Sequence, residues 1–166
     1  MKNNTLQASG YSTWQITLLT VLRVMIGWHF LYEGLVKIFS PAWSAESYLK
    51  ASVGPFSSIF HSMAESEVLL QAINLLNAWG LVIIGLCLFI GLFSKLAKIL
   101  GIVLLAFYYL SFPPFPELGT SGFVDGNYWV VNRNLIEIAA IAVLLVFPTS
   151  GITGIDRFIF KRNKKQ

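Results

Sequence analysis

The sequence is poor in cysteine and in charge, and each shortage excludes a class of protein. Its 166 residues include a single cysteine, Cys87, so the chain can form no internal disulfide and has no cysteine pair for thiol exchange. Charged residues make up 12% and hydrophobic residues 55%, whereas soluble domains have about 25% charged residues. The apolar residues come in long blocks, which is atypical of disordered or coiled-coil chains. The composition therefore indicates an integral membrane protein.

The sequence also lacks the motifs that hold common cofactors. It has no cluster of His, Cys and acidic residues with metal-ligand spacing, so no metal is expected. It has no glycine-rich phosphate loop and no nucleophile elbow. His29 and His61 are the only histidines, and a haem held by both would require the loop residue to reach between the helices, so haem is disfavoured. The cofactor stays unknown on these grounds.

Four apolar runs predict membrane-spanning helices, because crossing about 30 Å of hydrocarbon takes roughly 20 helical residues. No internal repeat divides the chain, so we predict one domain over residues 1–166. The predicted fold is all-α, an integral membrane four-helix bundle. The predicted helices are 16–39, 73–93, 96–112 and 130–147.

Basic residues predict the orientation, because Lys and Arg accumulate on the cytoplasmic side of membrane helices. Most of them fall on one side of the predicted bundle, while the opposite loops carry Lys50 and five acidic residues. Both termini are therefore expected to be cytoplasmic, with a basic cytoplasmic tail at 157–166. The residues assigned to this side are Lys2, Lys95, Lys98, Arg157, Lys161, Arg162, Lys164 and Lys165.

The first outer loop contains an amphipathic pattern. Phe56, Ile59, Phe60 and Met63 recur at i, i+3, i+4 and i+7, which predicts a short interfacial helix. The segment that contains this helix is either a loop docked on the protein or a lid over a site in the bundle, and both interpretations stay open.

Four ionisable residues fall inside the first apolar run, where each costs about 2.5 to 3.5 kcal/mol on insertion scales. At about 100° per residue they share one third of the helix circumference, so one face is polar. Two glycines, Gly27 and Gly34, lie beside this face and would let another helix approach closely. The polar face is therefore expected to point into the bundle. Its ionisable residues are Arg23, His29, Glu33 and Lys37.

The last helix carries a second polar group. Because the first and last helices run in opposite directions, Glu33 and Glu137 are expected at a common depth, about 8 to 11 Å below the outer surface. The sequence predicts a buried polar cluster in the outer half of the bundle that binds a polar ligand or relays protons. The alternative is that the cluster only holds the helices together. The candidates are His29, Glu33, Lys37, Asn74, Asn77, Arg133 and Glu137.

Arg23 lies nearer the inner surface, out of reach of this cluster. It either extends to a lipid phosphate or pairs with Asp156, the acidic residue that follows the last helix. An Arg23–Asp156 ion pair would join the first helix to the last, and breaking it would leave an uncompensated charge.

Several short motifs resemble those of the DoxX family. They are Arg23-x3-Gly27-x2-Phe30-x3-Gly34-x2-Lys37, the leucine-containing stretch from Gly80 to Gly91, and Gly-x-x-Gly-Ile-Asp at 151–156. The resemblance runs from about Leu18 to Arg157 and implies a DoxX-like four-helix membrane protein of the bacterial inner membrane. The DoxD branch includes a membrane subunit associated with thiosulfate:quinone oxidoreductase, which implies a redox partner protein or quinone chemistry. The residues that match the family pattern are Arg23, Gly27, Gly34, Lys37, Gly85 and Asp156.

This chain departs from the family in the second helix, where it has Asn74 and Asn77 and many relatives place an acidic residue. Two functions are therefore compared. The first is a subunit of a redox system, a candidate quinone-linked oxidoreductase subunit, that holds a quinone head group beside Trp28, Trp79 and Tyr108. The alternative is a non-catalytic scaffold or assembly factor. The lipid bilayer is an expected partner, a homo-oligomer stays open, and nucleic acid is not expected.

Overall fold

The computed structural model describes residues 11–114 and 129–160. Within these ranges the chain forms helices and no strand, which confirms the all-α prediction. The long helices are α2 (Thr13–Ile38), α5 (Glu67–Ile90), α6 (Ser94–Ser111) and α7 (Arg133–Val146). The short helices are α3 (Glu46–Lys50), α4 (Ser57–Glu65), α8 (Ser150–Thr153) and α9 (Asp156–Phe160). Part of the predicted basic tail, residues 161–166, lies outside the described residues.

Capping residues explain where the long helices begin and end. α2 begins after Ser12, which forms a capping box with Gln15, so two backbone N–H groups are satisfied at once. α5 begins six residues earlier than predicted because the side chain of Ser66 accepts a hydrogen bond from Leu69 N. It ends at Gly91, whose left-handed backbone, φ 72°, is favourable for glycine.

Three helices, α2, α5 and α6, are long and apolar enough to cross a membrane by length and composition. α7 lies where the fourth spanning helix is predicted but has 14 residues, which rise about 21 Å at 1.5 Å per residue. This is shorter than the roughly 30 Å of a typical hydrocarbon core. Residues 11–114 and 129–160 thus contain three candidate spans, and a four-span bundle stays a prediction.

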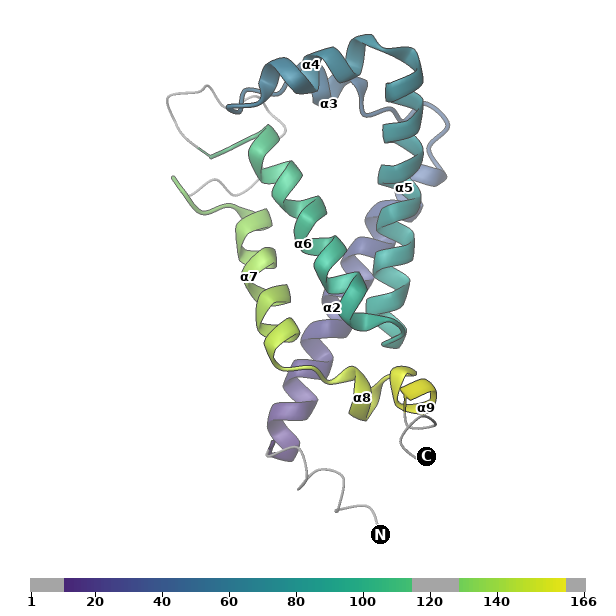
Figure 1. The fold of residues 1–166 in the computed structure, drawn as a ribbon, viewed down its shortest axis with the longest axis vertical. Helices are drawn as coiled ribbons and strands as arrows, with labels where there is room; N and C mark the ends of the chain where they lie inside the picture. The colour runs from purple at the N-terminus through teal and green to yellow at the C-terminus, as the bar shows by residue number, and fades with distance from the viewer. Residues whose placement is uncertain (1–10, 115–128, 161–166) are drawn as a thin grey trace.

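The long helices form two pairs, α2 with α5 and α6 with α7 (Figure 1). α6 starts close to the end of α5 and diverges from it toward the end of the molecule that carries α3 and α4. We call this the α4 end. The start of α2 lies at the opposite end together with α8 and α9, the α9 end.

Glycines bring α2 and α5 into close contact. A Cβ atom built on Gly27 would lie 2.5 Å from Phe89 N, and one on Gly34 would lie 2.7 Å from Val82 N. Such distances leave no room for a side chain, so both positions require glycine for this packing. The expectation that these two glycines let another helix approach is confirmed, and the helix is α5.

The four long helices share a hydrophobic core that includes Phe30, Leu88, Ile141 and Leu144. Their side chains are at most 1% exposed. A second small core of Ala45, Leu49, Phe60 and Ala64 joins α3 and α4. Burial of these side chains is the main favourable term that fixes the short helices in place.

The amphipathic pattern in the first loop forms α4, so the predicted short helix is present. Phe60 faces the small core, with 8% exposure, whereas Phe56 and Ile59 are 45% and 49% exposed. The apolar stripe is therefore divided between packing against the protein and an exposed face. An exposed apolar face suits the bilayer interface, and this location stays a prediction.

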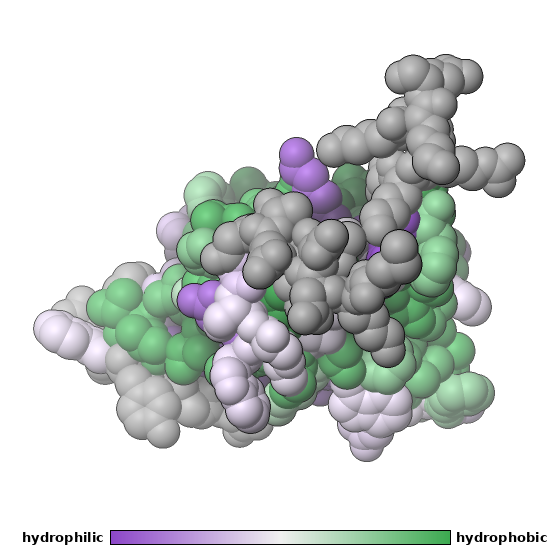
Figure 2. Space-filling view, turned by 90° about the horizontal axis from the view of Figure 1, so that it is seen from below, coloured by the Kyte–Doolittle hydropathy of each residue, from purple (hydrophilic) through white to green (hydrophobic). Residues whose placement is uncertain are grey.

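Large apolar side chains cover the outside of the long helices. Only 28% of the apolar window of α5 is buried inside the protein, and Leu18 of α2 and Leu76 of α5 are 66% and 71% exposed. Figure 2 shows hydrophobic residues around much of the outline seen from the α9 end. Soluble proteins rarely expose such continuous apolar surface, so lipid is the expected surrounding.

The segment between α8 and α9 closes over the turn that joins α5 to α6. Ile155 N donates to Ile90 O at 3.2 Å and Asp156 N donates to Gly91 O at 2.9 Å. The Asp156 carboxylate accepts from Phe93 N at 2.8 Å and from Ser94 N at 3.2 Å. Asp156 therefore caps the start of α6, where a negative charge is favourable because of the helix dipole.

Two cations at the α9 end are placed differently from the sequence analysis. Arg23 is 2% exposed and donates from Nη1 to Thr149 Oγ1 at 3.1 Å, so it does not extend to lipid. No ion pair within 4.0 Å joins it to Asp156 among the described residues, because that carboxylate instead accepts from the backbone of α6. Lys98, assigned to the cytoplasmic flank, is buried and donates to Leu144 O at 2.9 Å.

Candidate functional site

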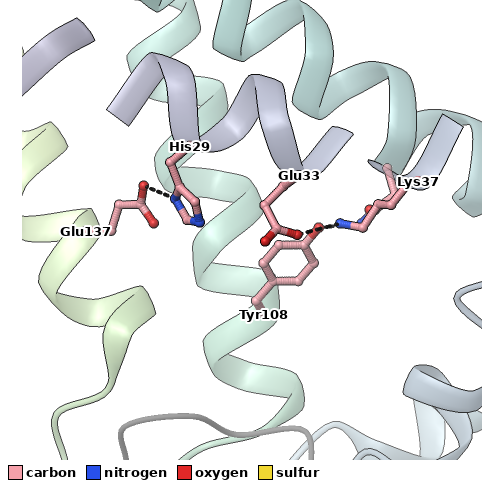
Figure 3. A network of polar contacts seen from close by, with 6 residues as sticks. His29, Glu33, Lys37, Tyr108 and Glu137 are labelled. Atoms are coloured by element: carbon pink, nitrogen blue, oxygen red, sulfur yellow. Dashed lines mark hydrogen bonds and ion pairs between the residues drawn. The ribbon is translucent and has the colours of Figure 1, made fainter. Parts of the chain in front are cut away.

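Polar residues of α2, α6 and α7 meet in the space between these helices (Figure 3). His29 Nδ1 of α2 lies 2.8 Å from Glu137 Oε1 of α7. The Glu137 side chain is 10% exposed and the His29 side chain 35% exposed. The pair thus joins the first and last long helices through a hydrogen bond at a largely buried position.

A second pair lies one turn further along α2. Glu33 Oε2 and Lys37 Nζ are 4.0 Å apart, and both side chains point toward Tyr108 (Figure 3). Lys37 Nζ also lies 5.4 Å from the ring centre of Trp43 and 5.8 Å from that of Tyr108. Aromatic faces attract a cation at such distances. Lys37 is therefore held by one carboxylate and two rings.

Glu137 pairs with His29, which precedes Glu33 by about one turn of α2. The common depth of Glu33 and Glu137 below the outer surface stays a prediction. The wider expectation, that polar side chains of separate helices meet, agrees with the contact between His29 and Glu137.

The two asparagines of α5 have different surroundings. Asn74 Oδ1 accepts from Ala45 N at 2.8 Å and its Nδ2 donates to Ser44 Oγ at 3.2 Å. Asn74 thus anchors the loop before α3 and lines neither cavity described below. Asn77 Nδ2 donates to Tyr108 Oη at 2.6 Å, and its Oδ1 is buried with no hydrogen-bond partner in the described part of the chain.

A polar cavity of about 210 Å³ lies among these residues. An extension of about 40 Å³ reaches His29. Arg133 lines both, is exposed, and forms no hydrogen bond or ion pair with another described residue. The cavity therefore has two cationic side chains and the Glu33 carboxylate in its wall. Its lining residues include Glu33, Lys37, Trp43, Tyr48, Asn77, Tyr108, Arg133 and Asn134.

An apolar cavity of about 360 Å³ adjoins the polar one, below α3 and α4 and between α5 and α6. The two cavities have a common wall, formed by Ala45, Tyr48, Asn77 and Tyr108. We call these four residues the shared wall. No sequence pattern predicts this second cavity, because it arises where α6 diverges from α5.

Tyr48 and Trp43 line the polar cavity but are absent from the sequence-derived candidates. Neither residue belongs to a sequence pattern that predicts a ligand site. Burial raises the pKa of Tyr48, and the neighbouring Tyr108 raises it further. Its hydroxyl therefore stays protonated at neutral pH.

Two of the three aromatic residues expected beside a ligand face elsewhere. Trp28 and Trp79 are 54% and 49% exposed and line neither cavity. Trp28 instead contacts Phe89, with ring centres 6.2 Å apart. Only Tyr108 lies in the cavity wall as expected.

The site offers hydrogen-bond donors rather than a metal-ligand set. Among residues 11–114 and 129–160, no three His, Cys, Asp or Glu side chains lie together. Lys37, Arg133 and the tyrosine hydroxyls can donate to oxygen atoms of a ligand. His29 and Glu137 can exchange a proton through their hydrogen bond.

Comparison with known families agrees with the motifs. The family model described as DoxX matches residues 18–113, a range that begins within α2 and ends just after α6. Asp156 and α7 lie beyond the match. No curated protein and no solved structure gives a significant match. The family model covers more than half of the chain, which shows that this membrane protein belongs to the DoxX family.

Proposed function

We propose that the protein is a membrane subunit of a redox system and that its polar cavity binds a quinone head group. The observation that carries the proposal is the polar cavity between apolar helices, with Lys37 and Arg133 in its wall. A buried apolar slot with a few directed polar groups is the usual form of a small-molecule site. Membership in the DoxX family supports the proposal.

The side chains fit the polar end of such a ligand. The exposed guanidinium of Arg133 lacks a described partner, and guanidinium groups are strong donors to oxygen. Lys37, held between Trp43 and Tyr108, would donate to a second oxygen. A quinone, when bound, supplies a two-electron acceptor that takes up two protons on reduction.

His29 and Glu137 fit a role in proton transfer at this site. The pair lies at the small extension of the cavity, where His29 is one of the lining residues. Histidine has an unperturbed pKa near neutrality, and paired acids and bases within a membrane often mark proton routes. We therefore propose that His29 passes protons between the cavity and Glu137.

The location and topology belong to the same proposal. The DoxX resemblance and the basic residues of the sequence support a bacterial inner membrane location with both termini in the cytoplasm. On this basis α3, α4 and the polar cavity lie toward the non-cytoplasmic face. A four-span bundle would then include α7 as a short span.

Binding of a short-chain quinone to the purified protein in lipid nanodiscs tests the proposal. Saturable binding is expected, weakened at least about tenfold by Lys37→Gln or Arg133→Gln, as expected for loss of a charged donor to a ligand oxygen. Lys50→Gln and Arg157→Gln are matched controls, because both residues are exposed and line neither cavity. Uptake that never saturates, or equal affinity in all five proteins, would refute the proposal.

The alternative is a non-catalytic scaffold or assembly factor. Its specific support is that His29 pairs with Glu137 and Glu33 with Lys37, so much of the charge is compensated within the protein. Under this alternative, Glu33→Gln reduces the cellular function only in proportion to protein abundance. Loss of function at normal abundance would favour the ligand site.

A further inference from the structure

The apolar cavity has a composition unlike that of its neighbour. Its walls come from α3, α4, α5 and α6, and its volume of about 360 Å³ is larger than that of the polar cavity. Most of its lining side chains are hydrocarbon or aromatic: Leu49, Phe60, Met63, Ile73, Leu76, Leu104 and Phe107. A cavity with such walls favours a hydrocarbon occupant over water.

The lining residues indicate where this cavity opens. Leu49 and Phe60 are buried, at 6% and 8% exposure, while Leu76 of α5 and Phe107 of α6 are 71% and 55% exposed. The open side is therefore the outer surface between α5 and α6, which carries apolar residues suited to lipid. A membrane-dissolved molecule could enter here without crossing water.

The shared wall lies between the apolar cavity and the polar one. Asn77 belongs to this wall, and its buried Oδ1 has no hydrogen-bond partner in the described part of the chain. A buried acceptor without a donor costs about 1 to 3 kcal/mol. A hydroxyl group held at this boundary would satisfy the acceptor once the Asn77 amide turns toward it.

We infer that the ligand of the polar cavity is a long-chain amphiphile, with its hydrocarbon chain in the apolar cavity and a head-group hydroxyl donating to Asn77 Oδ1. The inference rests on the proposed function, because it assigns the chain and the hydroxyl of the same ligand. Volume, apolar walls, a lipid-facing opening and a polar boundary all agree with such a molecule. A compact water-soluble ligand would leave the larger cavity without an occupant.

Three probes that share one ring separate the chain site from the hydroxyl contact: methylhydroquinone, decylhydroquinone and the dimethyl ether of decylhydroquinone. Their binding is measured by equilibrium dialysis with the full-length protein in maltoside micelles. Leu104→Trp fills the apolar cavity, and Leu100→Trp is the matched control, since Leu100 lies one turn earlier on α6, is 46% exposed and lines neither cavity.

The decyl probe should bind the wild-type protein more tightly than the methyl probe. Leu104→Trp should weaken decyl binding about tenfold, as expected for filling a formed cavity, and leave methyl binding and Leu100→Trp unchanged. The dimethyl ether should bind about tenfold more weakly than decylhydroquinone in the wild type, and this difference should disappear in Asn77→Leu.

Other results overturn the inference, and they are distinguishable from failure of the proposed function. Methyl and decyl probes that respond equally to Leu104→Trp would refute the chain site, while continued weakening of methyl binding by Arg133→Gln would leave the proposed function intact. Decyl binding that neither Leu104→Trp nor Arg133→Gln changes would indicate ordinary partitioning into the micelle and refute the inference. Absence of saturable binding by all probes would refute both.

Discussion

Buried polar side chains hold specific helices together, and each does so through few contacts. Glu137 contacts His29 across α2 and α7 at 2.8 Å, while Lys98 holds α6 to α7 through the Leu144 carbonyl. Arg23 joins α2 to the start of α8 through Thr149. A side chain of this kind is costly to bury without its partner, so each substitution should have an effect specific to one helix pair.

We predict that His29 and Glu137 stabilise the protein jointly. A double-mutant cycle with His29→Gln and Glu137→Gln should give a coupling free energy above about 0.5 kcal/mol, since directly contacting residues are seldom additive. The measurement is reversible unfolding in detergent, with the exposed pair Glu46 and Lys50 as the control cycle. Additive effects at His29 and Glu137 would contradict the contact.

Sequence reasoning identified the polar residue types but not all of their surroundings. His29, Glu33, Lys37 and Arg133 do line the polar cavity or its extension, because helical periodicity places residues on a common face. Periodicity cannot distinguish Asn74 from Asn77, since the choice depends on which loop packs against each. It also cannot show that Asp156 accepts from backbone N–H groups rather than from Arg23.

At the scale of helices, close packing of α2 on α5 depends on backbone contact. A Cβ atom built on Gly85 would meet Leu31 N and Gly27 O. Gly80 lies in the same helix, and a Cβ atom there would meet nothing within 4 Å. The two positions therefore separate steric contact from the intrinsic preference of alanine for helix.

Gly85→Ala should destabilise the protein, by about 1 to 3 kcal/mol as in overpacked cores. Gly80→Ala should be neutral or slightly stabilising, because alanine favours a helix interior by about 1 kcal/mol over glycine. Thermal unfolding of both variants in the same detergent checks the difference. Equal melting temperatures would show that α2 and α5 do not pack as closely as described.

Helix positions could be predicted from apolar runs, whereas helix ends could not. α5 extends six residues before its predicted start because Ser66 and Glu67 suit a helix N-terminus although they are polar. α7 is shorter than predicted at its start, where Asn132 caps it through Leu135 N. An apolar run predicts where a helix lies, whereas its capping residues determine where it begins and ends.

At the scale of the whole molecule, α4 and α9 lie at opposite ends (Figure 1). If the bundle spans a membrane with cytoplasmic termini, Ser58 of α4 and Arg157 of α9, both exposed, face opposite aqueous phases. This separation makes the proposed orientation testable with two single positions.

We expect Ser58→Cys, in a Cys87→Ser background, to react with a membrane-impermeant maleimide added to intact cells. Arg157→Cys in the same background should react only after permeabilisation, since the cytoplasmic side is then reached. The readout is the labelled fraction of purified protein. Labelling of Arg157→Cys in intact cells, with Ser58→Cys protected, would reverse the proposed orientation.

Family, helical class and the presence of a polar cluster were all accessible from the sequence, because they depend on composition, periodicity and short motifs. The two cavities were not. They result from the divergence of α6 from α5 toward the α4 end, where α3 and α4 pack across the end of the space between these two helices. Such spacing is a tertiary property that no local pattern encodes.

The contact between Asp156 and the start of α6 links synthesis to assembly. Phe93 N receives its acceptor from a residue 63 positions later in the chain, so α6 emerges from the ribosome with its first turn uncapped. That turn can be completed only when the final segment has been translated and has docked on Gly91. A nascent chain stalled before Asp156 would therefore lack the carboxylate that accepts from the first backbone N–H groups of α6.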